Sequence, residues 1–140
     1  DANDVWLPGK LALQSAVLEA RPEISLVFCH GVEFADPPGC APCREEPRPL
    51  VSGTALLARR EAFTTVGPFP PFRSGEFIAW YGWAQALGVA SHVLPEVLVR
   101  RRVHPTNSTR DRSALADYPL AIRWQLEKRR TLAAGKEPAP

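Results

Sequence analysis

The chain has 140 residues, 45% of them hydrophobic, with four Trp and six Phe, so it can build one packed domain and is not a disordered chain. Its formal net charge of +2 is too small to indicate a nucleic-acid-binding protein. No apolar run approaches the ~20 residues of a membrane span, and the three cysteines, an odd number, argue against a secreted disulfide framework.

The first half of the chain is predicted to alternate between helix and strand. Pro8 suits the first turn of a helix, and apolar residues at helical spacing continue until Arg21 and Pro22 stop the pattern. Residues 24–28 are a short apolar run with β-branched members, typical of a buried strand. A Pro-rich loop is expected over 33–49, followed over 50–57 by a strand that a Gly turn breaks.

The second half is expected to contain a short helix over 60–65, a rigid turn over 66–72 and a helix over 75–88 that Gly88 stops. Two short strands around Pro95, over 93–94 and 97–99, and a long last helix over 113–134 should follow. Pro119 must start or kink the last helix, which should carry Leu115, Ile122 and Leu126 on one face. This order indicates an α/β class with a mixed sheet and flanking helices.

A short acidic turn opens the chain. Asp1-x-Asn3-Asp4 places two carboxylates and an amide within one turn, directly before the first helix. Hard divalent cations such as Mg²⁺ or Mn²⁺ prefer oxygen ligands and bridge well to a diphosphate. The alternative is that these residues cap the helix, since Asn and Asp are favoured caps.

Three further stretches follow in a fixed order, over residues 52–69, 75–88 and 95–109. They contain Ser-Gly-Thr-Ala-Leu-Leu-Ala-Arg-Arg-Glu-Ala-Phe, then Gly-Glu-Phe-Ile-Ala-Trp-Tyr-Gly-Trp, then Arg-Arg-Arg-Val-His-Pro-Thr-Asn. Together with the acidic turn, they resemble the second half of a family-2 glycosyltransferase of the GT-A fold, from Asp1 to about Asn107. No one block is specific, whereas four in this order are fairly specific.

The resemblance implies a partial GT-A-like sheet that lacks the N-terminal nucleotide-binding βα units, which would lie before residue 1. We therefore expect a piece of a longer enzyme or a natural remnant of one. Its domain would comprise a metal and acceptor half over 1–112, a packed helix over 113–134 and a tail over 135–140. The implied activity is inverting transfer of a hexosyl-type sugar from a nucleotide-diphosphate sugar to an acceptor hydroxyl.

The resemblance also assigns residues on the donor side. Asp1 and Asn3 match the family's Asp-x-Asp motif and would face the sugar nucleotide and its Mn²⁺ or Mg²⁺. The usual second Asp is Asn3 here, and an amide oxygen ligates without charge, so metal affinity should fall unless Asp4 substitutes. His104 matches a late His that reaches the metal or diphosphate, and Arg102, like Asp4, would contact the leaving diphosphate.

On the acceptor side, Glu76 matches the family's acidic position and is the candidate general base, because an inverting transfer needs a group to take the acceptor proton. Gly53 and Trp80 would lie near the acceptor. The family often has Arg where Trp83 stands, so one phosphate or acceptor contact is absent. Glu76 could instead be an ordinary helix-start carboxylate, Trp80 a core residue and His104 a surface histidine.

The cysteines form a separate pattern. Cys40 and Cys43 make a Cys-x-x-Cys pair, which is half of a structural zinc site, and Cys29 or His30 could complete it. The alternative is a buried free Cys29 and an exposed loop pair that can oxidise. The resemblance does not require either feature.

A second function from a different class is a non-catalytic binding or scaffold module, which Asn3 and Trp83 favour. The expected partners of the enzyme are a nucleotide-diphosphate sugar and a carbohydrate or lipid-linked acceptor, without nucleic acid. An incomplete sheet exposes an unpaired edge, so the chain should form homo-oligomers or bind its missing N-terminal half. We expect a cytoplasmic location, with membrane association as the alternative.

Overall fold

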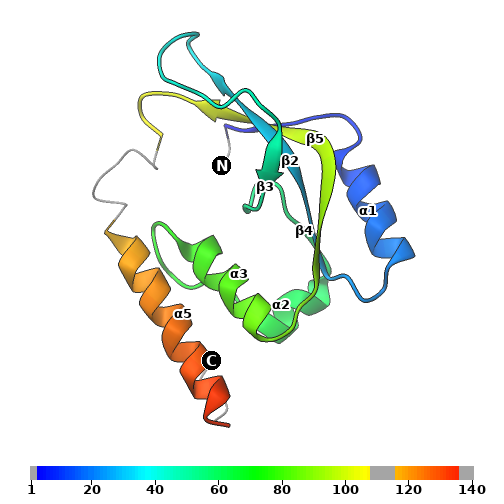
Figure 1. The fold of residues 1–140 in the computed structure, drawn as a ribbon, viewed down its shortest axis with the longest axis vertical. Coiled ribbons are helices and arrows are strands. Elements are labelled where there is room, and N and C mark those ends of the chain that lie inside the picture. Colours follow the sequence, from blue (N-terminus) through cyan, green and yellow to red (C-terminus); the bar gives the residue numbers. More distant parts are fainter. Residues whose placement is uncertain (1–2, 108–115, 136–140) are drawn as a thin grey trace. The chain divides into compact units, whose positions relative to one another are not determined.

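The computed structural model describes residues 3–107 and 116–135. It is an α/β structure with a mixed sheet and flanking helices, as the sequence predicted, and it divides into two units (Figure 1). The first unit contains Asp1–Arg59 and Ala90–Asn107. The second contains Arg60–Val89 and the described C-terminal residues, so residues 60–89 and the last helix belong to one unit.

The first unit is built on one sheet with strand order β1-β5-β2-β3, and β4 pairs with β2 beside β3. Its strands are β1 (Val5–Trp6), β2 (Leu26–Ala35), β3 (Arg48–Leu50), β4 (Leu57–Ala58) and β5 (Ser91–Val103). The central strands β2 and β5 are parallel, whereas β1, β3 and β4 run antiparallel to their neighbours. The ends of β2 and β5 therefore meet at one edge of the sheet, where polar side chains can converge.

The sheet departs from the sequence prediction at several places. Strand β1 was not predicted, and of the strand expected over 50–57 only Leu50 and Leu57 lie in strands, β3 and β4. β2 extends to Ala35 and β3 begins at Arg48, so the predicted loop over 33–49 is shorter, because the ends of that segment pair within the sheet. β5 is a continuous strand through Pro95, where two short strands were expected. Proline has no N–H to donate, and the ladder passes over it by shifting register between Cys29 and Gly31.

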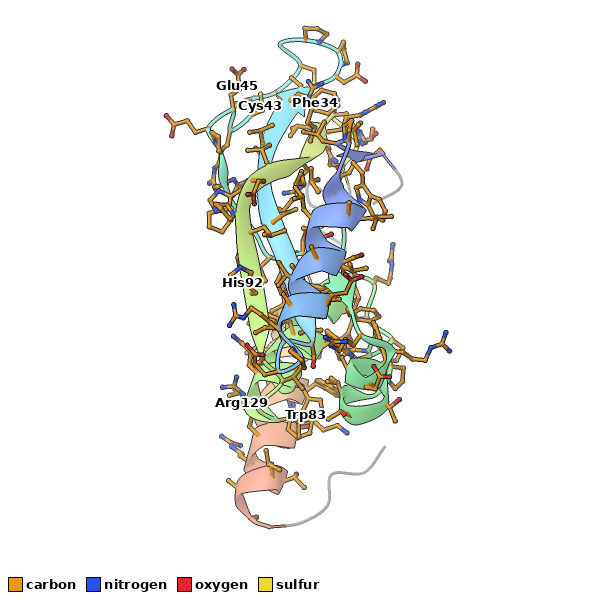
Figure 2. The ribbon with its side chains drawn as sticks, turned by 90° about the vertical axis from the view of Figure 1, so that its right-hand side faces the viewer. Phe34, Cys43, Glu45, Trp83, His92 and Arg129 are labelled. Atoms are coloured by element: carbon orange, nitrogen blue, oxygen red, sulfur yellow. The ribbon has the colours of Figure 1, made fainter. Side chains whose placement is uncertain are left out.

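Helix α1 (Lys10–Ala20) confirms the first predicted helix, and it contacts β2, β4 and β5 (Figure 2). Its buried positions are polar, namely Lys10 and Gln14, while Leu11 and Leu13 are exposed. Gln14 Nε2 donates to the carbonyl oxygens of Val27 (2.9 Å) and Ala55 (2.7 Å). Side-chain hydrogen bonds to the backbone thus attach the helix to the sheet, and Leu11 and Leu13 take no part in this contact.

The second unit contains α2 (Arg60–Val66), α3 (Glu76–Ala86) and α5 (Asp117–Ala133). Helices α3 and α5 pack together, and Arg129 Nη2 donates to the carbonyl oxygen of Gly82 at 3.1 Å. Ile122 and Leu126 lie four residues apart on α5, and both are exposed, whereas Ala121 is the buried residue of this helix. A small residue is favoured there because its methyl group lies 3.0 Å from the position of a Cβ at Gly75.

Candidate functional site

The strongest juxtaposition of predicted site residues lies where β5 ends. β1 pairs with β5 at Arg100 and Val99, which holds the residues before β1 beside the end of β5. Asn3 Nδ2 lies 2.7 Å from His104 Nε2, although 101 positions separate the two residues in sequence. His104 Nδ1 lies 3.0 Å from Thr106 Oγ1. If Nδ1 carries the proton and donates to Thr106, the Nε2 lone pair points at Asn3.

Asp4 and Asn107 fix the backbone around this contact. Asp4 Oδ1 accepts a hydrogen bond from the Arg102 N–H at 3.1 Å. Asn107 accepts from the His104 N–H through Oδ1 and donates to the Arg102 carbonyl oxygen at 3.3 Å. We call these residues (Asn3, Asp4, Arg102, His104 and Asn107) the Asn3–His104 corner. Asp4 is used to hold the strand end, so only its other oxygen remains for a ligand.

Arg102 is the cation of this corner. Its Nη1 lies 3.0 Å from Asp36 Oδ2, so its charge already has a carboxylate partner. Its Nε is buried and has no hydrogen-bond partner within the described residues. A buried N–H without an acceptor is costly. An anionic ligand at this corner would compete with Asp36 for Nη1, and it would reach Nε only if the Arg102 side chain moved.

A hollow of about 550 Å³ lies at the same edge of the sheet. Its lining residues come from β2, from β5 and from the loop that follows β2: Val32, Glu33, Phe34, Ala35, Pro38, Gly39, Glu45 and Arg100. The Arg100 guanidinium carbon lies 4.5 Å from the centre of the Phe34 ring. Figure 2 shows Phe34, Cys43 and Glu45 together at this end of the unit.

Glu33 connects the loop to the strands. Its carboxylate lies 2.6 Å from Arg48 and 3.6 Å from Arg101, and it accepts a hydrogen bond from the Arg44 N–H at 2.9 Å. The Glu33 N–H donates in turn to the Arg44 carbonyl oxygen at 2.8 Å. One partly buried carboxylate is therefore shared by two arginines and anchors the end of the loop.

The four zinc candidates lie in different surroundings. Cys29 is fully buried in β2, and burial raises the pKa of its thiol, while His30 follows it at a register shift. Cys40 Sγ donates to the Val103 carbonyl oxygen at 3.4 Å, and Cys43 Sγ lies 3.9 Å from Glu45 Oε1. Across the described residues, no group of three or more His, Cys, Asp or Glu is arranged to hold a metal ion. Zinc binding stays a prediction from the sequence.

The acceptor-side residues lie in both units. Gly53 belongs to the first unit, in the turn between β3 and β4, where its carbonyl oxygen accepts from the Leu56 N–H at 3.4 Å. Glu76 belongs to the second unit and opens α3, where the carboxylate faces the positive end of the helix dipole. Within residues 3–107 and 116–135, no hydrogen bond or salt bridge to the Glu76 carboxylate is found.

Trp80, the other acceptor-side candidate, is fully buried in the second unit. Its ring centre lies 5.0 Å from that of Phe63 and 5.1 Å from that of Phe69, and its Nε1 donates to the Gly67 carbonyl oxygen at 2.8 Å. This environment corresponds to the alternative interpretation of Trp80 as a core residue. Trp83 is also nearly buried, with the Lys128 ammonium 5.9 Å from its ring centre (Figure 2).

Sequence reasoning missed Lys10. Its side chain is 2% exposed, its Nζ donates to Gln14 Oε1 at 2.9 Å, and it lies 4.1 Å from the centre of the Trp6 ring. Burial lowers the pKa of Lys10, and the nearby Cys29 partly opposes this shift. The available signal was the four-residue spacing of Lys10 and Gln14, which places both on one helix face.

Asp1, the remaining metal candidate, lies outside the described residues, as does Leu115 of the last predicted helix. No helix among the described residues is long and apolar enough to cross a bilayer. No protein-family model matches the chain, and no curated protein matches its sequence. Two observations therefore bear on function: the resemblance of the sequence to family-2 glycosyltransferases and the contacts of the Asn3–His104 corner.

Proposed function

We propose that the chain carries the metal- and acceptor-side elements of an inverting, GT-A-like family-2 glycosyltransferase. The observation that carries this proposal is the 2.7 Å approach of Asn3 Nδ2 to His104 Nε2. The resemblance assigned both residues to one donor site, although Asn3 lies in the first of the four matching stretches and His104 in the last. A helix cap alone would not require Asn3 to meet a histidine 101 residues away.

The donor groups at the corner suit a divalent cation in part. Rotation of the Asn3 amide by half a turn would present Oδ1 beside His104 Nε2, giving one oxygen and one nitrogen ligand. An imidazole ligand favours Mn²⁺ over Mg²⁺, which prefers oxygen ligands alone. When bound, such a cation would neutralise the diphosphate of the donor. Further ligands would come from Asp1 and from the diphosphate oxygens.

The reaction assigned to the remaining groups is a displacement at the anomeric carbon. Glu76 would accept the proton of the acceptor hydroxyl, whose oxygen forms the new bond to the sugar as the bond to the diphosphate breaks. The diphosphate leaves with the bonding electrons. The resemblance assigns Arg102 to the oxygen that gains charge, and its guanidinium would have to leave Asp36 to donate there.

One observation favours the second candidate, a non-catalytic binding module. The Arg102 guanidinium is paired with Asp36, and Asp4 Oδ1 accepts from the strand end. Both groups assigned to the diphosphate are therefore partly engaged within the protein. A module that had lost its donor site would be expected to stabilise its former ligand groups in this way.

The test is calorimetric titration of the whole chain with Mn²⁺ and uridine diphosphate, and in parallel with guanosine diphosphate. We expect saturable binding of one diphosphate that depends on Mn²⁺ and is lost in His104→Ala. The matched control is His92→Ala, because His92 lies on β5 near its other end and contacts Arg21 at 3.3 Å (Figure 2).

Circular dichroism should show that the wild type and both variants are folded. A folded wild type that binds neither diphosphate would overturn the enzyme proposal and leave the binding module. Equal binding by His104→Ala and the wild type would also overturn it, because the Asn3–His104 contact would then have no role in the donor site.

A further inference from the structure

The loop between β2 and β3 carries two thiols that the proposed transferase does not use. Cys40 and Cys43 are both free and partly exposed, with only Ala41 and Pro42 between them. Even a fully extended chain of this length separates the two Cα atoms by at most about 11 Å. A disulfide needs a Cα separation of about 4.4–6.8 Å, which a turn at this position can provide. Pro42 restricts the backbone and reduces the conformational freedom that closure must remove.

The third cysteine provides an internal comparison. Cys29 is fully buried in β2, so a reagent in solution cannot reach its thiol. Burial also raises the pKa of this thiol, which disfavours the reactive thiolate. The two loop thiols are partly exposed, so solvent reaches them. A reagent in solution should therefore distinguish the pair from Cys29 as long as the first unit stays folded.

We propose that Cys40 and Cys43 form a reversible dithiol–disulfide site whose oxidant is a low-molecular-weight disulfide. One loop thiolate attacks the small disulfide and forms a mixed disulfide, releasing one small thiol. The second loop thiolate then attacks the protein sulfur of that mixed disulfide and releases the second small thiol. The two loop thiols lose two protons and two electrons, and the small disulfide becomes two thiols.

The structure indicates what oxidation would change. The Cys40 thiol donates to the Val103 carbonyl oxygen at 3.4 Å, and a disulfide sulfur has no proton to donate. Val103 is the last residue of β5 and directly precedes His104. Its carbonyl oxygen would keep the hydrogen bond from the Asp36 N–H, at 3.0 Å. Oxidation thus removes one of two loop contacts to this carbonyl.

The released segment lines the hollow at the edge of the sheet. Pro38 and Gly39 form part of its wall, between the two residues that contact Val103. The opposite end of the loop would remain attached through Arg44 and Glu33. The disulfide state should consequently have a looser wall beside Phe34 and Arg100, with the strands unchanged. This inference is independent of the proposed transferase activity.

The experiment incubates the native chain with oxidised glutathione and follows intact mass and free thiols. We expect the thiol count to fall from the three cysteines of the sequence to one, with a loss of two hydrogens and no retained glutathione. Cys40→Ser and Cys43→Ser should each stop at a mixed disulfide with one glutathione. Cys29→Ala should behave like the wild type and form the internal bond.

Retention of glutathione by the wild type, or disulfides between chains on a non-reducing gel, would overturn the proposal. So would reaction of Cys29 at the rate of the loop thiols in folded protein. The second measurement is amide hydrogen exchange, which should be faster over residues 36–41 in the disulfide form and unchanged over residues 26–29. Equal exchange over 36–41 in both forms would overturn the release of the loop from Val103.

Discussion

The two halves of β2 both pair in parallel with β5, but their side chains differ in burial and polarity. Before the register shift, Leu26, Val27, Phe28 and Cys29 are all fully buried. After it, Glu33 and Phe34 pair with Arg101 and Arg102, and no residue from Val32 to Ala35 is buried. Strand β2 thus supplies core residues at one end and residues of the candidate site at the other, while the buried Leu98 and Val99 of β5 lie next to the shift.

The register shift separates these two halves. Gly31 lies just after it, and a Cβ at this position would approach Leu50 Cδ2 to 2.8 Å and the Val99 carbonyl oxygen to 3.2 Å. The backbone of β2 therefore lies unusually close to its neighbours at this point. The close approach positions the polar end of β2 relative to β5, and so relative to the Asn3–His104 corner.

The largest effect should come from truncating the buried half. Phe28→Ala removes a fully buried ring and should lower the free energy of unfolding by about 3–5 kcal/mol. The matched variant is Phe34→Ala, six positions along the same strand, whose ring is partly exposed and contacts Arg100. Urea denaturation should show a clearly smaller loss for Phe34→Ala. Equal losses would show that the two halves contribute alike.

A smaller effect is expected at the charged half. Glu33→Ala leaves Arg48 and Arg101 without their shared carboxylate and releases the Arg44 N–H, so it should cost about 1–3 kcal/mol. Glu46→Ala, an exposed carboxylate of the same loop, is the control and should change stability by less than about 0.5 kcal/mol. Both are measured by urea denaturation. Equal values would mean that the Glu33 contacts do not stabilise the loop.

The pH dependence of stability should report on the buried Lys10. Burial lowers the folded-state pKa of Lys10 below its ordinary value of 10.5, so the unfolded chain binds more protons between these two values. Stability from this group therefore rises as pH increases through that window. We expect the free energy of unfolding of the wild type to rise relative to Lys10→Met as pH approaches 10.5.

The Cys29 thiol titrates in an overlapping range, with its pKa raised above 9.0, so it makes the folded state less stable at alkaline pH. Because the Lys10 ammonium lowers the pKa of Cys29, both chains are compared with Cys29→Ala in place, which removes this contribution. Urea denaturation at pH 7 and near pH 10 measures the difference in the free energy of unfolding between the two chains at each pH. A pH-independent difference would show that the ammonium of Lys10 is fully solvated.

The smallest stability effect should come from His104→Ala. Its ring contacts Asn3 and Thr106 at a partly exposed edge, so its loss should cost less than about 1 kcal/mol. Thermal unfolding should show a small shift, in contrast to the loss of diphosphate binding expected for the same variant. A cost comparable to that of Phe28→Ala would assign His104 to the structural half of the ladder.

Local sequence signals were sufficient for the helices. The predicted helices over 60–65 and 75–88 agree with α2 (Arg60–Val66) and α3 (Glu76–Ala86) within two residues at each end. Their start and stop depend on the residues within one or two turns, such as Gly75 and Gly88, which adopt positive φ at 82° and 77°. The α/β class followed from the same local patterns.

The tertiary structure decided which helix faces are buried and how the strands pair. The apolar spacing predicted where α1 and α5 form but not which faces are buried: Leu11, Leu13, Ile122 and Leu126 are exposed. Burial depends on the partner surface, and Gln14 is buried because the Val27 and Ala55 carbonyl oxygens need its amide. The path of β5 through Pro95 likewise depends on β2, which accommodates the proline by a register shift.

The sequence by itself singled out Asn3 and His104 as candidates for one site. Only the tertiary structure decided that these two side chains meet and that Arg102 is paired with Asp36. The contact between Asn3 and His104 joins residues 101 positions apart. It depends on strand order, because the pairing of β1 with β5 brings the two residues together. Local periodicity carries no information about that pairing.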